Sequence, residues 1–186
     1  MQKKTFLAAL LTLAIVSPAF AREVAGVTLP DTTTVEGKTL KLNGMGLRKK
    51  AVVIKVYVLG LYLETPSRDA AAVISSDQVK SIRMSLLRSV GGAKITETIM
   101  EGFERNSKAQ MGALKPRLDK LHAMIPDVVR GDEIVLTYVP GKGTVVSAKG
   151  VEKGVIEGKD FADALFSVWL GLNPAQEDLK KALLGG

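Results

Sequence analysis

Arg48 and Tyr57 are the residues of this sequence whose types best suit the capture of a small anion. An arginine presents a planar fork of N–H donors to two oxygens, and a tyrosine hydroxyl adds a neutral donor. Among the aliphatic residues that surround Tyr57, such a pair is suited to holding a carboxylate. A second interpretation needs no ligand: Arg48 pairs with a surface acid, and Tyr57 packs with its hydroxyl in water.

The spacing of Arg48 and Tyr57 leaves open whether the two side chains meet. They stand nine positions apart. Because nine is odd, an unbroken strand would direct the two side chains to opposite faces. Convergence therefore requires a bend or a bulge around Lys49 and Lys50.

The composition excludes most other site chemistries. The chain has no cysteine and a single histidine, His122. Without cysteine there is no thiol nucleophile, disulfide or thiolate metal cluster, and one histidine does not make a multi-histidine zinc site. His122 lies in a helical stretch without a second histidine, so we expect it at the surface. We predict no metal site and no cofactor.

We predict no nucleotide or calcium site. Two glycine-bearing segments and one acidic cluster are the candidates for such sites. The segment 44–49 lacks the third glycine of a dinucleotide fingerprint, and the segment 141–144 lacks the upstream glycine of a phosphate-binding loop. We interpret both as turns. Asp127, Asp132 and Glu133 are too few for a calcium site and indicate solvated charge.

The N-terminus predicts export. Lys3 and Lys4 precede an apolar run over 6–16, and the segment 17–21 ends in an Ala-x-Ala pattern. A charged region, a short apolar region and a small-residue cleavage site form a secretory signal peptide. The apolar run of 11 residues is too short for the ~20 residues that span a bilayer. We expect cleavage after residue 21, a periplasmic or secreted protein, and no integral membrane segment.

The remaining chain, residues 22–186, is expected to form one folded domain. Of the 186 residues, 46% are apolar and 24% charged, which excludes a disordered chain. The formal net charge is +7, but the basic residues are scattered singly or in pairs. Because the protein is expected to be exported and has no arginine-rich run, we predict no nucleic-acid partner.

The apolar patterning predicts an α+β fold, with an antiparallel sheet and helices packed on one face. A helix with Ser67 as its N-cap, two helices divided at Pro116 and a last helix capped by Asn173 are also expected. We expect strands at 24–29, 32–35, 39–46, 51–63, 80–87, 133–139, 144–148 and 151–156. We expect helices at 67–76, over 95–125, at 161–170 and after 173.

Several of these segments together resemble a known family. The segments 44–48 (GMGLR) and 55–64 (KVYVLGLYLE) resemble the signature of chalcone isomerase-like proteins. The segment 94–97 resembles the start of a helix in that family, and 161–185 resembles its bacterial exported branch. The resemblance implies an open-faced β-sandwich, in which a curved antiparallel sheet carries helices on one face above a cleft.

The resemblance also implies roles for individual residues. In the plant enzymes, which cyclise chalcone to a flavanone, an arginine, a threonine, a tyrosine and an asparagine form the site. Arg48 matches the arginine, whereas the other three positions fall on Tyr57, near Gly91 and on Thr98. An arginine with a tyrosine at the strand position is instead the pattern of the fatty-acid-binding members. The resemblance thus implies that Arg48, Tyr57 and Thr98 bind a small apolar carboxylate such as a fatty acid, without catalysis.

Two alternatives stay open from the sequence. The first is an isomerase or intramolecular lyase of the chalcone isomerase type, with Arg48 as the electrophile. The second is a structural accessory protein whose cleft is filled by its own side chains. Aliphatic residues of the segment 53–61, with Ile99 and Phe103, either line the cleft or fill it.

Overall fold

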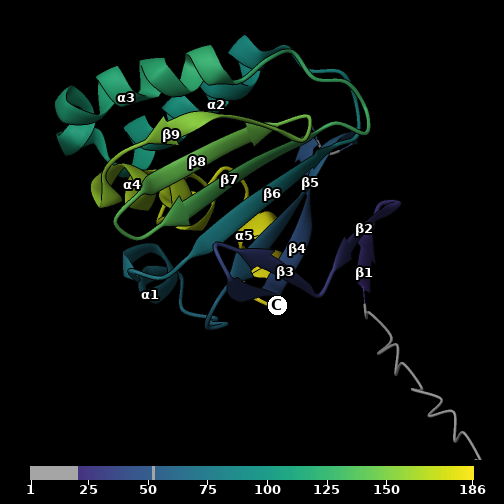
Figure 1. Ribbon diagram of the computed structural model, residues 1–186. Coiled ribbons are helices and arrows are strands. Elements are labelled where there is room, and N and C mark those ends of the chain that lie inside the picture. Colours follow the sequence, from purple (N-terminus) through teal and green to yellow (C-terminus); the bar gives the residue numbers. More distant parts are fainter. Residues whose placement is uncertain (1–20, 52) are drawn as a thin grey trace, which may run out of the picture.

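The computed structural model describes residues 21–51 and 53–186, so the predicted signal peptide lies outside the described residues except for Ala21. The main element is a seven-stranded antiparallel sheet in which neighbours in the sequence are neighbours in space (Figure 1). Its strands are β3 (Thr32–Val35), β4 (Lys38–Lys50), β5 (Ile54–Leu63), β6 (Lys80–Leu86), β7 (Glu133–Val139), β8 (Gly143–Ala148) and β9 (Val151–Ile156).

The helices cover one face of this sheet, and the predicted α+β architecture is confirmed. Figure 1 shows α4 and α5 behind the strands, with α2 and α3 above them. No helix of the described chain is long and apolar enough to cross a membrane. The helices are α1 (Ala70–Ser75), α2 (Gly92–Asn106), the short 3₁₀ helix η1 (Lys108–Gln110), α3 (Met111–Met124), α4 (Lys159–Leu170) and α5 (Glu177–Leu183).

Strand β5 is buried on both faces, as its continuous apolar sequence indicates. Tyr57 and the alternate residues after it belong to the core between sheet and helices, whereas Val58 and Tyr62 belong to a smaller core on the other face. That second face is covered by the hairpin of β1 (Ala21–Val24) and β2 (Val27–Pro30). Leu29 packs there, and the Tyr62 hydroxyl donates to the carbonyl oxygen of Pro30 at 2.8 Å.

The predicted division of the central helical region at Pro116 is wrong. Helix α2 ends at Asn106, because Ser107 after it leaves the helical conformation with φ −135° and ψ 30°, and Pro116 lies inside α3. Because Pro116 falls in the second turn of α3, its missing N–H removes only one backbone bond, the one to Gly112. Pro126 does end the region, since Ile125 before it is already extended.

Two predicted helix caps are also wrong. Asp69, rather than Ser67, caps α1, because its carboxylate accepts from the backbone N–H groups of Ala71 and Ala72. Helix α5 begins at Glu177, after Gln176. Asn173 lies in the preceding loop, where its backbone N–H donates to the Asn106 side chain at 2.9 Å.

Gly44 and Gly46 lie within β4, and the prediction of a turn there is wrong. A Cβ atom on Gly44 would meet the carbonyl oxygen of Ala182, and one on Gly46 would lie 2.8 Å from the side chain of Leu179. Both neighbours belong to α5. The two glycines therefore let α5 pack directly against the strand that carries Arg48.

We expect Gly44→Ala to lower the free energy of unfolding by about 1–3 kcal/mol, because an overpacked contact forces α5 away from β4. Gly112→Ala is the matched control, since a Cβ atom there meets nothing within 4 Å. In helix α3 this control should be neutral or raise stability by up to about 1 kcal/mol. Urea denaturation followed by Trp169 fluorescence measures both, and equal stabilities would contradict the close packing of α5 on β4.

Candidate functional site

A hairpin brings Arg48 and Tyr57 together. Strand β4 ends at Lys50 and β5 begins at Ile54, so the chain reverses between the two residues. Arg48 and Tyr57 are direct cross-strand partners, and such pairs project from the same face of a sheet. The register shifts between Arg48 and Lys49, which leaves Val56 as an extra residue on β5. The odd spacing therefore does not separate the two side chains.

Arg48, Tyr57 and Thr98 all line one cavity of about 670 Å³. It lies between the strands β4 to β6 on one side and the helices α2 and α4 on the other. Its volume falls in the usual range of small-molecule sites. Eight of its eighteen lining residues are aliphatic or sulfur-containing: Ile54, Val56, Met84, Leu86, Val90, Ile95, Ile99 and Val168.

The Arg48 guanidinium presents one unoccupied edge. Its Nη1 donates to the carbonyl oxygen of Lys49 at 2.6 Å and to Oε1 of Gln176 at 3.1 Å. Within the described part of the chain, no carboxylate lies within 4 Å of Arg48, and its Nε and Nη2 make no hydrogen bond. These two nitrogens form the edge that binds a carboxylate through two parallel bonds. The alternative in which Arg48 pairs with a surface acid therefore has no acidic partner among the described residues.

Tyr57 supplies a neutral donor beside that edge. Only 7% of the residue is exposed, and its hydroxyl oxygen accepts from Trp169 Nε1 at 3.1 Å. Burial raises the pKa of Tyr57 above its usual 10.0, whereas the Trp169 hydrogen bond and the adjacent Arg48 guanidinium, through its charge and as a donor, act to lower it. The hydroxyl stays protonated near neutral pH, and no described residue accepts its proton. That proton is available to a ligand oxygen.

Thr98 contributes to the wall rather than to the donor set. It is half-buried on α2, and its hydroxyl donates to the carbonyl oxygen of Lys94 at 2.9 Å. A threonine hydroxyl has one proton, so Thr98 can accept a hydrogen bond from a ligand but has no free donor.

Positive charge dominates the cavity lining. Arg48, Lys50, Arg88 and Lys94 line it, against the single carboxylate of Glu101. Lys94 pairs with Glu97 at 2.6 Å, and Glu101 lies 3.8 Å from Arg105, so these two charges are largely offset. The remaining cations favour an anionic ligand.

Sequence reasoning missed two residues of this site, Trp169 and Gln176. Trp169 falls in the predicted helix 161–170, and a buried indole N–H usually requires an acceptor, so it signals a polar partner. Gln176 follows Asn173, the predicted cap of the last helix. Gln176 accepts from Arg48 and from the backbone N–H of Lys49 at 3.0 Å. Nothing in the sequence marks that contact.

The candidate lining residues divide into two groups. Ile99 lines the cavity together with Val56 at the beginning of β5. Phe103 is fully buried and packs on Phe161, with ring centroids 5.4 Å apart. Leu59 and Leu61 likewise belong to the closed core. The cleft is therefore open near the start of β5 and filled farther along the strand.

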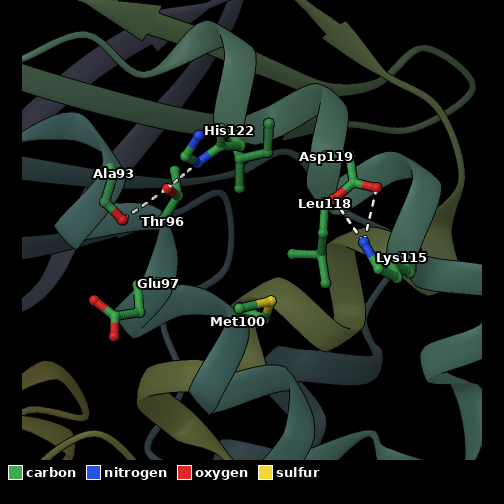
Figure 2. A pocket seen from close by; sticks show the side chains of 9 residues that line it. Ala93, Thr96, Glu97, Met100, Lys115, Leu118, Asp119 and His122 are labelled. Carbon is green, nitrogen blue, oxygen red and sulfur yellow. Dashed lines mark hydrogen bonds and ion pairs between the residues drawn. The ribbon is translucent and has the colours of Figure 1, made fainter.

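A second cavity, of about 300 Å³, lies between α2 and α3 (Figure 2), and its polar side chains already have partners, Glu97 through Lys94 outside the lining. The Thr96 hydroxyl lies 2.6 Å from Nδ1 of His122, and Lys115 pairs with Asp119 at 3.0 Å. His122 is exposed, as expected. With its charges already paired, this cavity is a weaker candidate than the one at Arg48.

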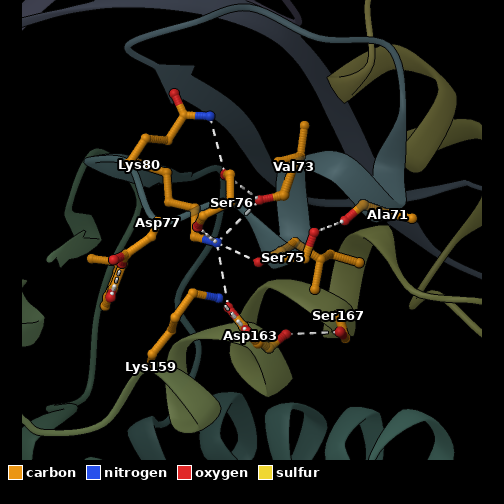
Figure 3. A network of polar contacts seen from close by, with 12 residues as sticks. Ala71, Val73, Ser75, Ser76, Asp77, Lys80, Lys159, Asp163 and Ser167 are labelled. Carbon is orange, nitrogen blue, oxygen red and sulfur yellow. Dashed lines mark hydrogen bonds and ion pairs between the residues drawn. The ribbon is translucent and has the colours of Figure 1, made fainter.

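Lys80 is fully buried but lines neither cavity. Its Nζ donates to the carbonyl oxygens of Val73 at 3.0 Å and Ser76 at 3.1 Å, and lies 3.5 Å from Asp163 of α4 (Figure 3). Burial lowers the pKa of Lys80 to about 8, against the attraction of Asp163. The group is still charged at neutral pH and caps the carboxyl end of α1, which is a structural role.

The family follows from a comparison of the sequence with family models. A model described as chalcone isomerase-like matches residues 21–185. The chain belongs to the chalcone isomerase-like family. The resemblance of the segments 44–48 and 55–64 is thereby confirmed, together with the curved antiparallel sheet that it implies.

A solved structure supports the same fold. The crystal structure of a fatty-acid binding protein of Arabidopsis thaliana superposes with a TM-score of 0.72. The two chains are 16% identical, and the match covers 89% of this chain and 96% of the plant protein. At this identity the likeness is one of fold. Comparison with curated proteins finds no significant match.

We expect Tyr57→Phe to lower the free energy of unfolding by about 1–3 kcal/mol, because the buried Nε1–H of Trp169 loses its acceptor. The double variant Tyr57→Phe/Trp169→Phe should lose less stability than the sum of the two single variants, because the pair is already broken in each of them. Circular dichroism during urea denaturation measures each variant. A single variant as stable as the wild type would contradict the assignment of this hydrogen bond.

Proposed function

We propose that the protein is an exported, non-catalytic binding protein for a fatty acid. The proposal rests on one observation: a guanidinium edge without a carboxylate partner among the described residues lies beside a tyrosine proton donor at the wall of an apolar cavity. A ligand carboxylate would accept two bonds from Arg48 and one from Tyr57. Its hydrocarbon chain would lie against the aliphatic wall, where burial of each CH₂ group contributes about 0.8 kcal/mol.

The donor set supports binding rather than turnover. Isomerisation of the chalcone type needs a group that moves a proton, and burial holds Tyr57 in its protonated form. The positions that correspond to the plant tyrosine and asparagine fall near Gly91 and on Thr98. Glu101, the one carboxylate of the lining, lies close to Arg105. The fatty-acid-binding members of the family are therefore the better analogy.

Export is supported by the sequence alone. The lysines at positions 3 and 4, the short apolar run and the Ala-x-Ala motif fit a cleaved signal peptide. The family match begins at residue 21, at the predicted cleavage site. A mature chain that begins at Arg22 would keep the whole described domain apart from the first residue of β1.

The decisive test is native mass spectrometry of the protein isolated from the exported fraction. We expect the mass of a chain that begins at Arg22, with a fatty acid bound to the wild type and lost from Arg48→Ala. Removal of a charged hydrogen-bonding group from the site should weaken palmitate binding by about 1.5–3 kcal/mol, or roughly ten- to a hundredfold. Trp169, the only tryptophan and part of the lining, provides a fluorescence signal for the titration.

Lys41→Ala is the matched control, since Lys41 is an exposed cation on the same strand and does not line the cavity. It should bind palmitate as the wild type does. Cetyl alcohol, which lacks the carboxylate, should bind Arg48→Ala and wild type alike. Equal palmitate affinities for Arg48→Ala and wild type would refute the carboxylate site, and turnover of chalcone would establish the isomerase alternative.

Two substitutions of Thr98 test whether this residue only lines the cavity or also forms a hydrogen bond with the ligand. Thr98→Val should leave palmitate affinity within about twofold, because the hydroxyl proton is engaged with Lys94 within the helix. Thr98→Trp should abolish binding, because a large side chain on the half-buried wall would occupy the cavity. Fluorescence displacement of a bound fluorescent fatty acid measures both. A large loss in Thr98→Val would show instead that this hydroxyl contacts the ligand.

A further inference from the structure

Three segments meet at the mouth of the large cavity and form one continuous surface. They are the β4–β5 hairpin, the loop from β6 to α2, and the loop from α3 to β7. The Leu87 N–H donates to the Val56 carbonyl at 2.9 Å, and Val90 and Val128 exchange two backbone hydrogen bonds of 2.9 and 3.0 Å. In Figure 1 these loops lie at the end of the sheet where β5 begins. We call this surface the rim.

The rim carries a cluster of cations that form no ion pair in the described chain. All five are exposed, and none has a carboxylate within 4 Å among residues 21–51 and 53–186. Elsewhere in the same part of the chain, eleven ion pairs involve other basic residues. The rim cations are Lys49, Lys50, Lys55, Arg88 and Arg130.

The two acidic residues of the rim loops accept backbone hydrogen bonds. Asp127 accepts from the backbone N–H of Gly92 at 2.8 Å, and Asp132 accepts from that of Val129 at 2.8 Å. Asp132 also lies 3.4 Å from Lys149. The three rim segments therefore carry five cations against these two carboxylates and keep a net positive charge.

Exposed aliphatic side chains lie among these cations. Val53 is 80% exposed, Ile54 37% and Val129 53%, which makes the rim the site of three of the six large apolar residues exposed in the described chain. A surface that mixes Lys and Arg with protruding aliphatic groups suits the interface of an anionic bilayer. Lysine and arginine stems lie along the apolar boundary there while their charged ends reach the headgroups.

The chemistry favours a lipid surface over a protein partner. Protein interfaces concentrate binding energy in aromatic anchors seated in pockets. The rim segments 49–55, 86–91 and 127–132 contain no aromatic residue. Lys50, Ile54 and Arg88 belong to the rim and also line the cavity, so the cavity opens onto this surface.

We propose that the rim docks the protein on an anionic phospholipid bilayer, with the cavity mouth against the membrane. This inference goes beyond the proposed fatty-acid binding and rests on residues other than Arg48, Tyr57 and Thr98. Docking in this orientation places the cavity where an acyl chain passes between the bilayer and the protein without crossing water.

The test is co-sedimentation of the mature protein with vesicles. We expect binding to vesicles of phosphatidylcholine with phosphatidylglycerol, little binding to phosphatidylcholine alone, and a decrease with added salt. The variant Lys49→Glu/Lys55→Glu/Arg130→Glu alters only rim residues outside the cavity lining. Because each cation near an anionic bilayer contributes roughly fivefold to affinity, the triple variant should bind at least about a hundredfold more weakly.

The control Lys41→Glu/Lys108→Glu/Lys153→Glu makes the same change in net charge at exposed residues elsewhere. It should keep most of the vesicle binding, and an equal loss in both triple variants would overturn the proposal. Val53→Ser/Val129→Ser should bind several-fold more weakly. Unchanged binding in that variant would refute membrane docking in favour of a purely electrostatic partner. Failure of the wild type to bind anionic vesicles would also refute membrane docking.

Palmitate titration keeps this proposal distinct from the proposed function. The rim triple variant should bind palmitate like the wild type, since Arg48 and Tyr57 are intact. Arg48→Ala should bind vesicles like the wild type while it loses palmitate. Vesicle binding that disappears with Arg48→Ala would place the membrane contact at the cavity and contradict the rim.

Discussion

The register of β4 against β5 is the constraint on which the site depends. It sets Arg48 opposite Tyr57, and it directs Gly44 and Gly46 to the face that receives α5. A slip of one residue would move Arg48 to the other face of the sheet. It would also replace the two glycines by larger side chains under α5. Close packing of α5 in turn brings Gln176 to the guanidinium, so the positioning of Arg48 and the packing of the C-terminus are one arrangement.

The same sheet explains why the cleft is open at one end only. Farther along β5, the space between sheet and helices is filled by Phe103 and other large residues of the core. Near the start of β5, the facing helix α2 begins at Gly92, whose N-terminal neighbour Gly91 lines the cavity without a side chain. The open end of the cleft therefore coincides with the glycine pair at the start of α2.

Residue types and their alternation predicted most of the strands and the pair of site residues. The contacts between distant segments were visible only in the structure. The apolar alternation predicted nearly every strand, and the pairing of an arginine with a tyrosine among aliphatic residues indicated the site. The chain reversal between Lys50 and Ile54 was not predicted at this place. The run from Ala51 to Leu63 is apolar at both odd and even positions, so it resembles a single strand that begins at Ala51. Pro116 was assigned too much weight, since a proline in an early turn costs one hydrogen bond. The role of Gln176 depends on a contact across 128 positions of the chain, which local patterns do not encode.

Charge at the rim and charge at Arg48 would act on a fatty acid in different ways. Exposed lysines are surrounded by water, so each attracts a carboxylate weakly and its effect is reduced by salt. Arg48 is half-buried, has one nitrogen held by Gln176 and the Lys49 carbonyl, and lies opposite a neutral donor. Partial burial strengthens its electrostatic interaction and fixes the orientation of its free edge. The rim cations therefore add little to the affinity for a single carboxylate, whereas Arg48 and Tyr57 provide the interaction that retains one.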